Sequence, residues 1–144
     1  MKHFMTSVED YELYLYTLTE KFPSVKRSTV VLARRGAGLA RVAGEIHFDL
    51  GYRLVIRERL LLHCFPIVID WYGYEIWKGE EKLCWYDSQP HPGEQKLESS
   101  YPHHKHVPPN MTRNRIPAPE MSFNPPNLHI PILEIENLIE KDKS

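Results

Sequence analysis

Residues 29–87 alternate between apolar and polar side chains, and this alternation constrains the fold more than any other feature of the sequence. A period of two places successive side chains on opposite faces of a β-strand. Glycines in residues 35–38 and at Gly51 and Gly79 interrupt the alternation where turns are needed. The pattern predicts an antiparallel meander over residues 28–87. Its expected strands lie at about 28–34, 39–49, 52–62, 66–77 and 82–87.

Helical spacing of apolar residues flanks this meander on both sides. Residues 7–22 form the first predicted helix, with capping-box spacing from Thr6 to Glu9 and with Pro23 at its end. A short second helix is predicted over residues 128–141. The order of helix, antiparallel sheet and helix predicts an α+β fold in which both helices pack on one face of the sheet.

Prolines dominate the segment between the sheet and the second helix. Eight of the twelve prolines lie between Pro102 and Pro131. Since proline lacks a backbone N–H, residues 88–127 are expected to form neither sheet nor long helix, and to wrap the domain as an extended strap. The length of 144 residues, of which 42% are hydrophobic, fits one core. Residues 1–144 are therefore predicted to form a single domain.

The charge balance excludes binding to a polyanion through bulk electrostatics. The net charge is −1 at pH 7, so nucleic acid would have to be held by local groups of arginines. The candidate RNA contacts are Arg34, Arg35, Arg53 and Arg59. No stretch resembles a secretory signal or a membrane span, and the two cysteines lack CxxC spacing. A cytoplasmic protein without a cofactor or a membrane partner is expected.

One strand carries a carboxylate among apolar residues. In the predicted strand 52–62, Glu58 shares a face with Leu54 and Ile56, whereas Arg57 points the other way. Burying a charge is costly unless the charge is paired or the pKa shifts, so Glu58 is a candidate for function. The alternatives are that it lies at a wet strand end or pairs with an arginine of a neighbouring strand. Tyr74, on the next predicted strand, is a second candidate for orienting substrate or handling protons.

Four of the eight histidines fall within residues 91–106, close to Asp87 at the end of a predicted strand. Histidine suits proton transfer near neutral pH, and the neighbouring prolines restrict the backbone. Three uses compete: metal-independent RNA cleavage, a metal site, and a binding surface without chemistry. The histidines and lysine of this cluster are His91, His103, His104, Lys105 and His106.

For RNA cleavage, His103, His104 and His106 would supply the base that removes the proton of the 2′-hydroxyl, the acid that protonates the leaving 5′-oxygen, and a group that orients them. Lys105 and Arg57 would stabilise the phosphorane. For a metal site, His106 with either His103 or His104 could ligate together with Asp87 or His91. The spacing leaves these alternatives open.

Several longer runs identify a family resemblance. The segments GEEKLCWYDSQPHP, PHHKHVPP and NRIPAPEMSFNPPNL, followed by an acidic terminal helix, resemble the TumE-like proteins of bacteria and archaea. The most specific element is PHHKH, intact at Pro102 to His106, and Y-x-Y-E at Tyr72 to Glu75 and WYD at Trp85 to Asp87 add support. The likeness covers nearly the whole chain.

The resemblance implies the toxin component of a toxin–antitoxin pair, neutralised by a partner encoded nearby, with ribonuclease activity as the plausible mode. The leading prediction is therefore a metal-independent ribonuclease that uses the histidine cluster. A non-enzymatic module that binds protein or nucleic acid and a metal-dependent hydrolase with a His/Asp site are the alternatives. A homodimer is also possible, because exposed aromatic strands can pair.

Overall fold

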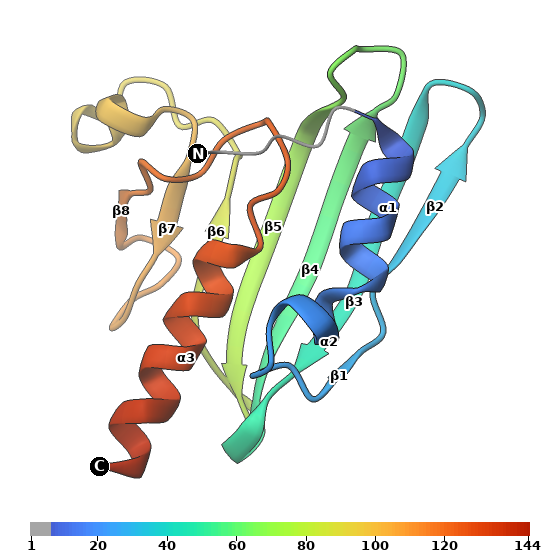
Figure 1. Cartoon of the computed structure of the whole chain (residues 1–144). Helices are drawn as coiled ribbons and strands as arrows, with labels where there is room; N and C mark the ends of the chain where they lie inside the picture. The colour runs from blue at the N-terminus through green and yellow to red at the C-terminus, as the bar shows by residue number, and fades with distance from the viewer. Residues whose placement is uncertain (1–6) are drawn as a thin grey trace.

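The computed structural model describes residues 7–144 as an antiparallel sheet with helices on one face (Figure 1). The predicted α+β class is confirmed. Within residues 7–144 the sheet has eight strands, in the order β1-β3-β4-β5-β6-β7-β8, and β2 also pairs with β3. The strands are β1 (Arg27–Ser28), β2 (Val31–Arg35), β3 (Leu39–His47), β4 (Tyr52–Leu61), β5 (Val68–Lys78), β6 (Glu81–Asp87), β7 (His104–His106) and β8 (Arg115–Pro117).

The first predicted helix is two helices, α1 (Val8–Tyr16) and α2 (Leu18–Lys21). Ser7 caps α1 by accepting a hydrogen bond from the backbone N–H of Asp10, and Thr6 of the predicted capping box lies outside the described residues. The break falls at Thr17, whose hydroxyl donates to the carbonyl of Leu13 at 2.7 Å and which leaves the helical region of backbone conformation. The expected single helix over 7–22 is therefore wrong at this residue.

The first predicted strand is likewise divided, into β1 and β2, at Thr29 and Val30. Gly44 lies opposite this break on β3 with φ of 148°. A Cβ atom there would lie 2.6 Å from the carbonyl oxygen of Thr29, so only glycine fits. Strand β5 starts at Val68 rather than at the expected residue 66, which is a proline without an N–H to donate.

Strands β7 and β8 correct the prediction that residues 88–127 form no sheet. They extend the sheet beyond β6 and contain three residues each. Strand β7 contains no proline, and the one proline of β8, Pro117, is its last residue on the outermost strand. Strands this short leave the neighbouring prolines outside the hydrogen-bonded ladder, which is why a proline-rich segment can still extend a sheet. Two 3₁₀ helices, η1 (Asp49–Gly51) and η2 (Gln95–Ser100), lie in connections.

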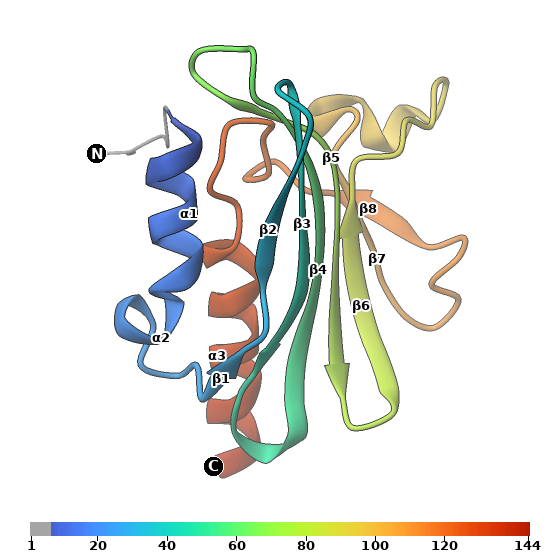
Figure 2. The same cartoon turned by 90° about the vertical axis from the view of Figure 1, so that its right-hand side faces the viewer.

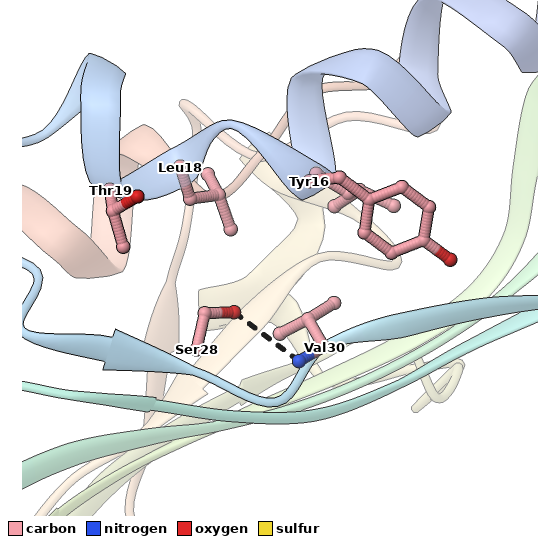
Figure 3. Close-up of a pocket in the computed structure, with 6 residues that line it drawn as sticks. Tyr16, Leu18, Thr19, Ser28 and Val30 are labelled. Carbon is pink, nitrogen blue, oxygen red and sulfur yellow. Dashed lines mark hydrogen bonds between the residues drawn. The ribbon is translucent and has the colours of Figure 1, made fainter.

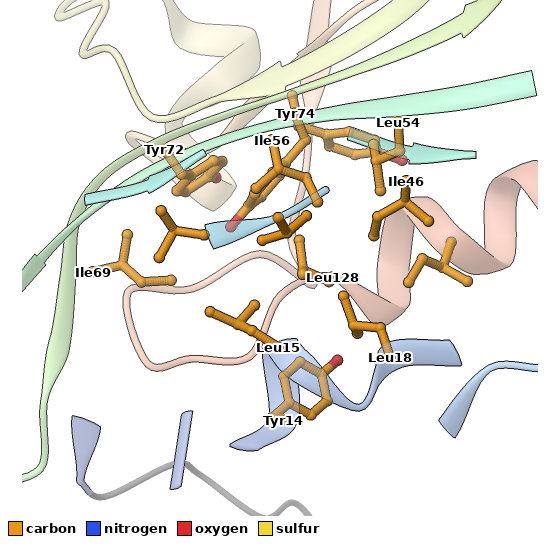
Figure 4. Close-up of a cluster of buried hydrophobic side chains, with 14 of the residues drawn as sticks. Tyr14, Leu15, Leu18, Ile46, Leu54, Ile56, Ile69, Tyr72, Tyr74 and Leu128 are labelled. Atoms are coloured by element: carbon orange, nitrogen blue, oxygen red, sulfur yellow. The ribbon is translucent and has the colours of Figure 1, made fainter. Parts of the chain in front are cut away.

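The last helix, α3 (His129–Lys143), packs beside α1 and α2 on the same face of the sheet, as Figure 2 shows edge-on. We call this covered face the inner face and the opposite one the outer face. Side chains from α1, α2 and the strands meet those of α3 in one core between helices and sheet (Figure 4). Among residues 7–144, no helix has the length and apolar character needed to cross a membrane.

Candidate functional site

The outer face brings together four residues from four adjacent strands. The sheet register aligns Arg57 on β4 with Gly73 on β5, Asp87 on β6 and His104 on β7. Residues in register on neighbouring strands share a face, so this row runs across the outer face. Because Gly73 has no side chain, the row leaves a gap between the Arg57 guanidinium and the Asp87 carboxylate.

This gap is part of a hollow of about 150 Å³. Arg57 and Asp87 lie on either side of Gly73 in this row, and Glu75 forms an ion pair with Arg57 at 3.6 Å. The Arg57 side chain is 59% exposed, so its guanidinium is available to a ligand in the hollow. The lining residues are Arg57, Trp71, Gly73, Glu75, Trp85 and Asp87.

Asp87 also belongs to a compact cluster with two imidazoles. Asp87 Oδ1 lies 2.8 Å from His104 Nε2, and Asp87 Oδ2 lies 3.3 Å from His106 Nε2. The two Nε2 atoms are 3.1 Å apart. His104 and His106 are buried, whereas the Asp87 side chain is 17% exposed and opens the cluster toward the hollow. These residues come together because positions 104 and 106 of β7 face the same side and β6 places Asp87 opposite His104.

The other nitrogen of each ring is fixed by a backbone carbonyl. Nδ1 of His104 lies 3.0 Å from the carbonyl oxygen of Pro102, and Nδ1 of His106 lies 2.6 Å from that of Met111. A carbonyl oxygen only accepts hydrogen bonds, so both Nδ1 atoms carry a proton. In the neutral rings, therefore, both Nε2 atoms present a lone pair to each other and to the Asp87 carboxylate.

Hydrogen bonds from β6 and the following turn orient this carboxylate. Asp87 Oδ2 accepts from Trp85 Nε1 at 2.9 Å, and Oδ1 accepts from the N–H of Gln89 at 3.0 Å. Burial alone would raise the pKa of Asp87, but the bond and charge of a protonated His104, with the bonds from Trp85 and Gln89, lower it to about 2. Burial lowers the pKa of His104, yet the bond to Asp87, the bond to the Pro102 carbonyl and the charge of Asp87 together outweigh burial, so the pKa is raised. For His106, burial dominates and the pKa is lowered.

His91 lies at the edge of this cluster and is half-buried. Its ring packs edge-on against that of His104, with centroids 4.8 Å apart. Burial and the charge of Arg115 lower its pKa. His91 is therefore the imidazole of the cluster with the greater access to solvent.

The structure separates His103 and Lys105 from this cluster. Nδ1 of His103 lies 2.7 Å from the Tyr72 hydroxyl, and its ring stacks on Tyr72 and packs against Phe123. Lys105 forms an ion pair with Glu134 of α3 at 2.6 Å. Both contacts lie on the inner face. The prediction that three imidazoles and Lys105 meet at one site is therefore wrong for His103 and Lys105. The alternation of side chains along a strand, applied to residues 104–106, would have separated Lys105 from its neighbours.

Glu58 and Tyr74 also lie on the inner face. Glu58 is 2% exposed and accepts hydrogen bonds from the hydroxyls of Tyr11 at 2.6 Å and Tyr74 at 2.5 Å. Asn127 Nδ2 donates to the Tyr74 hydroxyl at 3.3 Å. Burial raises the pKa of Glu58 to about 6, against the lowering effect of the two tyrosine hydroxyls. Neither a wet strand end nor an arginine partner explains Glu58, and the sheet separates it from Arg57 and Asp87.

The predicted RNA-binding arginines are divided between the two faces. Register places Arg53 and Arg59 on the outer face with Arg57. Arg53 lies over the Trp77 ring at 4.7 Å, and Arg59 forms an ion pair with Asp70 at 2.6 Å. Arg34 instead turns toward α1, where it pairs with Glu12 at 2.7 Å, and Arg35 is exposed at the end of β2.

Trp85 is the main participant that sequence reasoning missed as part of the site. Its indole lines the hollow, donates to Asp87 and stacks on His106 with centroids 3.9 Å apart. Lys82 lies over the same ring at 4.4 Å. The sequence shows the alternation that puts Trp85 and Asp87 on one face of β6. It does not show that β6 pairs with β7, which brings His106 to Trp85.

A second hollow, of about 170 Å³, lies between the first two helices and the strands beneath them (Figure 3). Its lining residues are Leu15, Tyr16, Leu18, Thr19, Ser28 and Val30. These side chains include no histidine, carboxylate or cation, so this hollow offers no comparable chemistry.

Comparisons with known proteins complete the description of the site. Neither the curated proteins nor the solved structures yielded a match. A family model described as Toxin TumE matches residues 15–139, a span that includes α2, all eight strands and every member of the Asp87 cluster. The outer-face site and the fold that builds it are thus within the matched region, and the chain belongs to the TumE toxin family.

Proposed function

We propose that this toxin cleaves RNA at the outer-face site, in the hollow between Arg57 and Asp87. The proposal rests mainly on Asp87, because this one carboxylate contacts both the hollow and the histidine pair. Asp87 lines a hollow that contains an exposed guanidinium, and it also joins two imidazoles within 3.3 Å. A phosphodiester needs a cation for its phosphate and titratable groups beside it, and this arrangement offers both.

The reaction we propose is cleavage by the neighbouring 2′-hydroxyl. The 2′-oxygen forms a bond to phosphorus while the bond from phosphorus to the 5′-oxygen breaks. A base accepts the proton of the 2′-hydroxyl and an acid donates a proton to the leaving 5′-oxygen. The products are a 2′,3′-cyclic phosphate and a 5′-hydroxyl, and the chain itself is unchanged.

The phosphate, the stacked base and one of the two proton transfers have candidate groups. Arg57 would hold the phosphate, and the exposed ring of Trp71 offers a surface on which a base can stack. His91, the more accessible imidazole, would be one of the two proton-transfer groups. The facing atoms of Asp87, His104 and His106 can hold one positive charge, either a proton or a cation, next to the reacting phosphate.

The family supports a dedicated partner. We propose that a cognate antitoxin encoded nearby neutralises the protein in the cytoplasm. The net charge of −1 favours an RNA recognised locally, by shape and a few stacked bases, over one held by bulk electrostatics.

The test is cleavage of RNA by purified His91→Ala and by purified wild type, together with growth of a bacterial host in which each is induced. Loss of one proton-transfer group typically lowers the rate by about 10²- to 10⁴-fold. We therefore expect His91→Ala to cleave at least 100-fold more slowly and to relieve the growth defect.

His63→Ala is the matched control, because His63 lies in the loop between β4 and β5 and is not among the described residues that line the hollow or form the Asp87 cluster. It should cleave as the wild type does. A folded His91→Ala protein that cleaves RNA at the wild-type rate would remove His91 from the mechanism. A wild type that is toxic without cleaving any RNA would refute the ribonuclease proposal itself and favour a binding module.

A further inference from the structure

The side chains of Asp87, His104 and His106 place three hydrogen-bond acceptors close together without a donor between them. With both Nδ1 atoms donating to carbonyls, two nitrogen lone pairs and a carboxylate face one another at 2.8 to 3.3 Å. Three acceptors at these separations repel one another unless something positive lies among them. A proton or a metal ion could supply this charge.

Neither one nor two added protons give every acceptor of the cluster a favourable partner. A single proton on His104 Nε2 can be shared with Asp87 Oδ1 and with His106 Nε2. The lone pair of His106 Nε2 would then still face Asp87 Oδ2 at 3.3 Å. A second proton, on His106, would place two imidazolium nitrogens 3.1 Å apart in a buried site, where like charges are costly.

The spacing suits a divalent ion. Bonds of about 2.0 to 2.2 Å from an ion to nitrogen or carboxylate ligands imply distances of about 2.8 to 3.6 Å between neighbouring ligand atoms, from octahedral to tetrahedral coordination. The 2.8 Å from Asp87 Oδ1 to His104 Nε2 and the 3.1 Å between the two Nε2 atoms lie in that range. The other carboxylate oxygen, Oδ2, lies 3.3 Å from His106 Nε2. One ligand atom from each of the three residues lies within 4.8 Å of the others.

The hydrogen-bond partners of these three side chains are also those expected around a metal site. Metal-binding histidines usually donate their other ring N–H to a carbonyl or a carboxylate, which fixes the tautomer. Both imidazoles here donate Nδ1–H to a backbone carbonyl, and the Asp87 carboxylate is oriented by Trp85 and Gln89. The ligands stand on strands β6 and β7, which hold them rigidly.

We infer that Asp87, His104 and His106 bind a divalent first-row transition-metal ion, of the class that includes Zn²⁺, through one carboxylate oxygen and two Nε2 atoms. Two imidazoles and a carboxylate suit this class, and three protein ligands leave coordination positions open. The inference rests on the proposed function for its use, because an ion here would stabilise charge on a phosphate in the adjacent hollow. With such an ion, cleavage would depend on a metal, which was the alternative to the metal-independent cleavage expected from the sequence.

The experiment is zinc titration of the chelator-treated full chain by calorimetry, with Co²⁺ as a spectroscopic probe. We expect one ion per chain, at micromolar affinity or tighter, and visible Co²⁺ absorption that Zn²⁺ abolishes. Asp87→Ala and His106→Ala should each weaken zinc binding at least 100-fold, whereas His63→Ala should leave it unchanged. Equal zinc binding by wild type and folded His106→Ala would overturn the inference, as would the absence of binding.

A second measurement serves if these variants fail to fold. Long-range ¹H–¹⁵N spectra of the wild-type histidines distinguish a ring protonated at Nδ1 alone from an imidazolium. Zinc should shift two Nε2 signals and leave both Nδ1 protons in place. Two imidazolium protons on His104 that persist in excess zinc would overturn the inference in favour of a shared proton.

RNA cleavage assays of the same samples separate the two proposals. Zinc binding without cleavage by the zinc-loaded protein would retain the ion and refute the ribonuclease. Cleavage that a chelator leaves unchanged, by a protein that binds no zinc, would retain the ribonuclease and refute the ion.

Discussion

The two faces of strands β4, β5 and β6 carry two polar clusters that differ in how completely their hydrogen bonds are satisfied. On the inner face, the Glu58 oxygens accept from the hydroxyls of Tyr11 and Tyr74, and Asn127 donates to the Tyr74 hydroxyl. On the outer face, Asp87 and two Nε2 atoms meet as three acceptors. The inner cluster is complete with protein atoms alone, and the outer one requires a further positive charge. Burial of a polar group thus marks a ligand site only where donors and acceptors fail to match.

Two glutamates on neighbouring strands test this contrast most strongly. Glu58→Ala would leave the buried hydroxyls of Tyr11 and Tyr74 without their acceptor, at about 1 to 3 kcal/mol each. We expect the free energy of unfolding to fall by about 3 kcal/mol or more, measured by urea denaturation. Glu75→Ala on the outer face removes partly exposed ion pairs with Arg57 and Lys82 and should cost about 1 kcal/mol or less. Equal losses would contradict the contrast.

The pH dependence of the free energy of unfolding tests the protonation of Glu58. Its pKa is raised from 4.5 to about 6 in the folded chain by burial, with Tyr11 and Tyr14 of α1 and Tyr74 of β5 around it. A raised pKa means that the folded state binds the proton more tightly than the unfolded state does. The resulting stabilisation is complete below about pH 4.5 and is lost as the pH rises through about 6.

Relative to Glu58→Gln, which keeps an oxygen acceptor but cannot titrate, the wild type should therefore lose about 2 kcal/mol between pH 4 and pH 7. Urea denaturation of both proteins across this range measures the difference. A difference that stays constant with pH would show that Glu58 does not take up a proton in this range.

His103 and His106 provide the next comparison, since they are close in sequence and lie on opposite faces. His103→Ala removes the partner of the Tyr72 hydroxyl and the ring contact with Phe123, so we expect a loss of about 1 to 2 kcal/mol. Because His103 lies away from the outer-face cluster, RNA cleavage should change less than about threefold. Cleavage rates and thermal unfolding of His103→Ala and His106→Ala, measured side by side, check this. A folded His103→Ala that loses cleavage would place function on the inner face.

Two arginines give the smallest expected effect. Arg57→Ala removes one phosphate contact, so it should weaken RNA binding about tenfold and lower the salt dependence of binding by about one ion. Arg34→Ala breaks an exposed pair with Glu12 on α1 and should change RNA affinity by less than about twofold. Filter binding at several salt concentrations measures both. An Arg34→Ala effect as large as that of Arg57→Ala would show that RNA does not bind the outer face alone.

The sequence by itself determined the parts of this protein that depend on local periodicity. Alternation over residues 29–87 predicted the antiparallel strands, and it placed Glu58 and Arg57 on opposite faces, as observed. The helical spacing near both ends predicted the covering layer on one face. These features follow from residues a few positions apart, whose side-chain directions the backbone geometry fixes.

Only the tertiary structure decided which histidines meet. His104 and His106 reach Asp87 because β7 pairs with β6 across a proline-rich connection whose path no local pattern reveals. The same pairing turns Lys105 toward α3, while His103, just before β7, packs against Tyr72 on the inner face. The tautomers, too, depend on the carbonyls of Pro102 and Met111, which the loops around β7 position. Chemistry that requires atoms within about 3 Å is set by long-range packing, so composition could name the candidates but not assemble them.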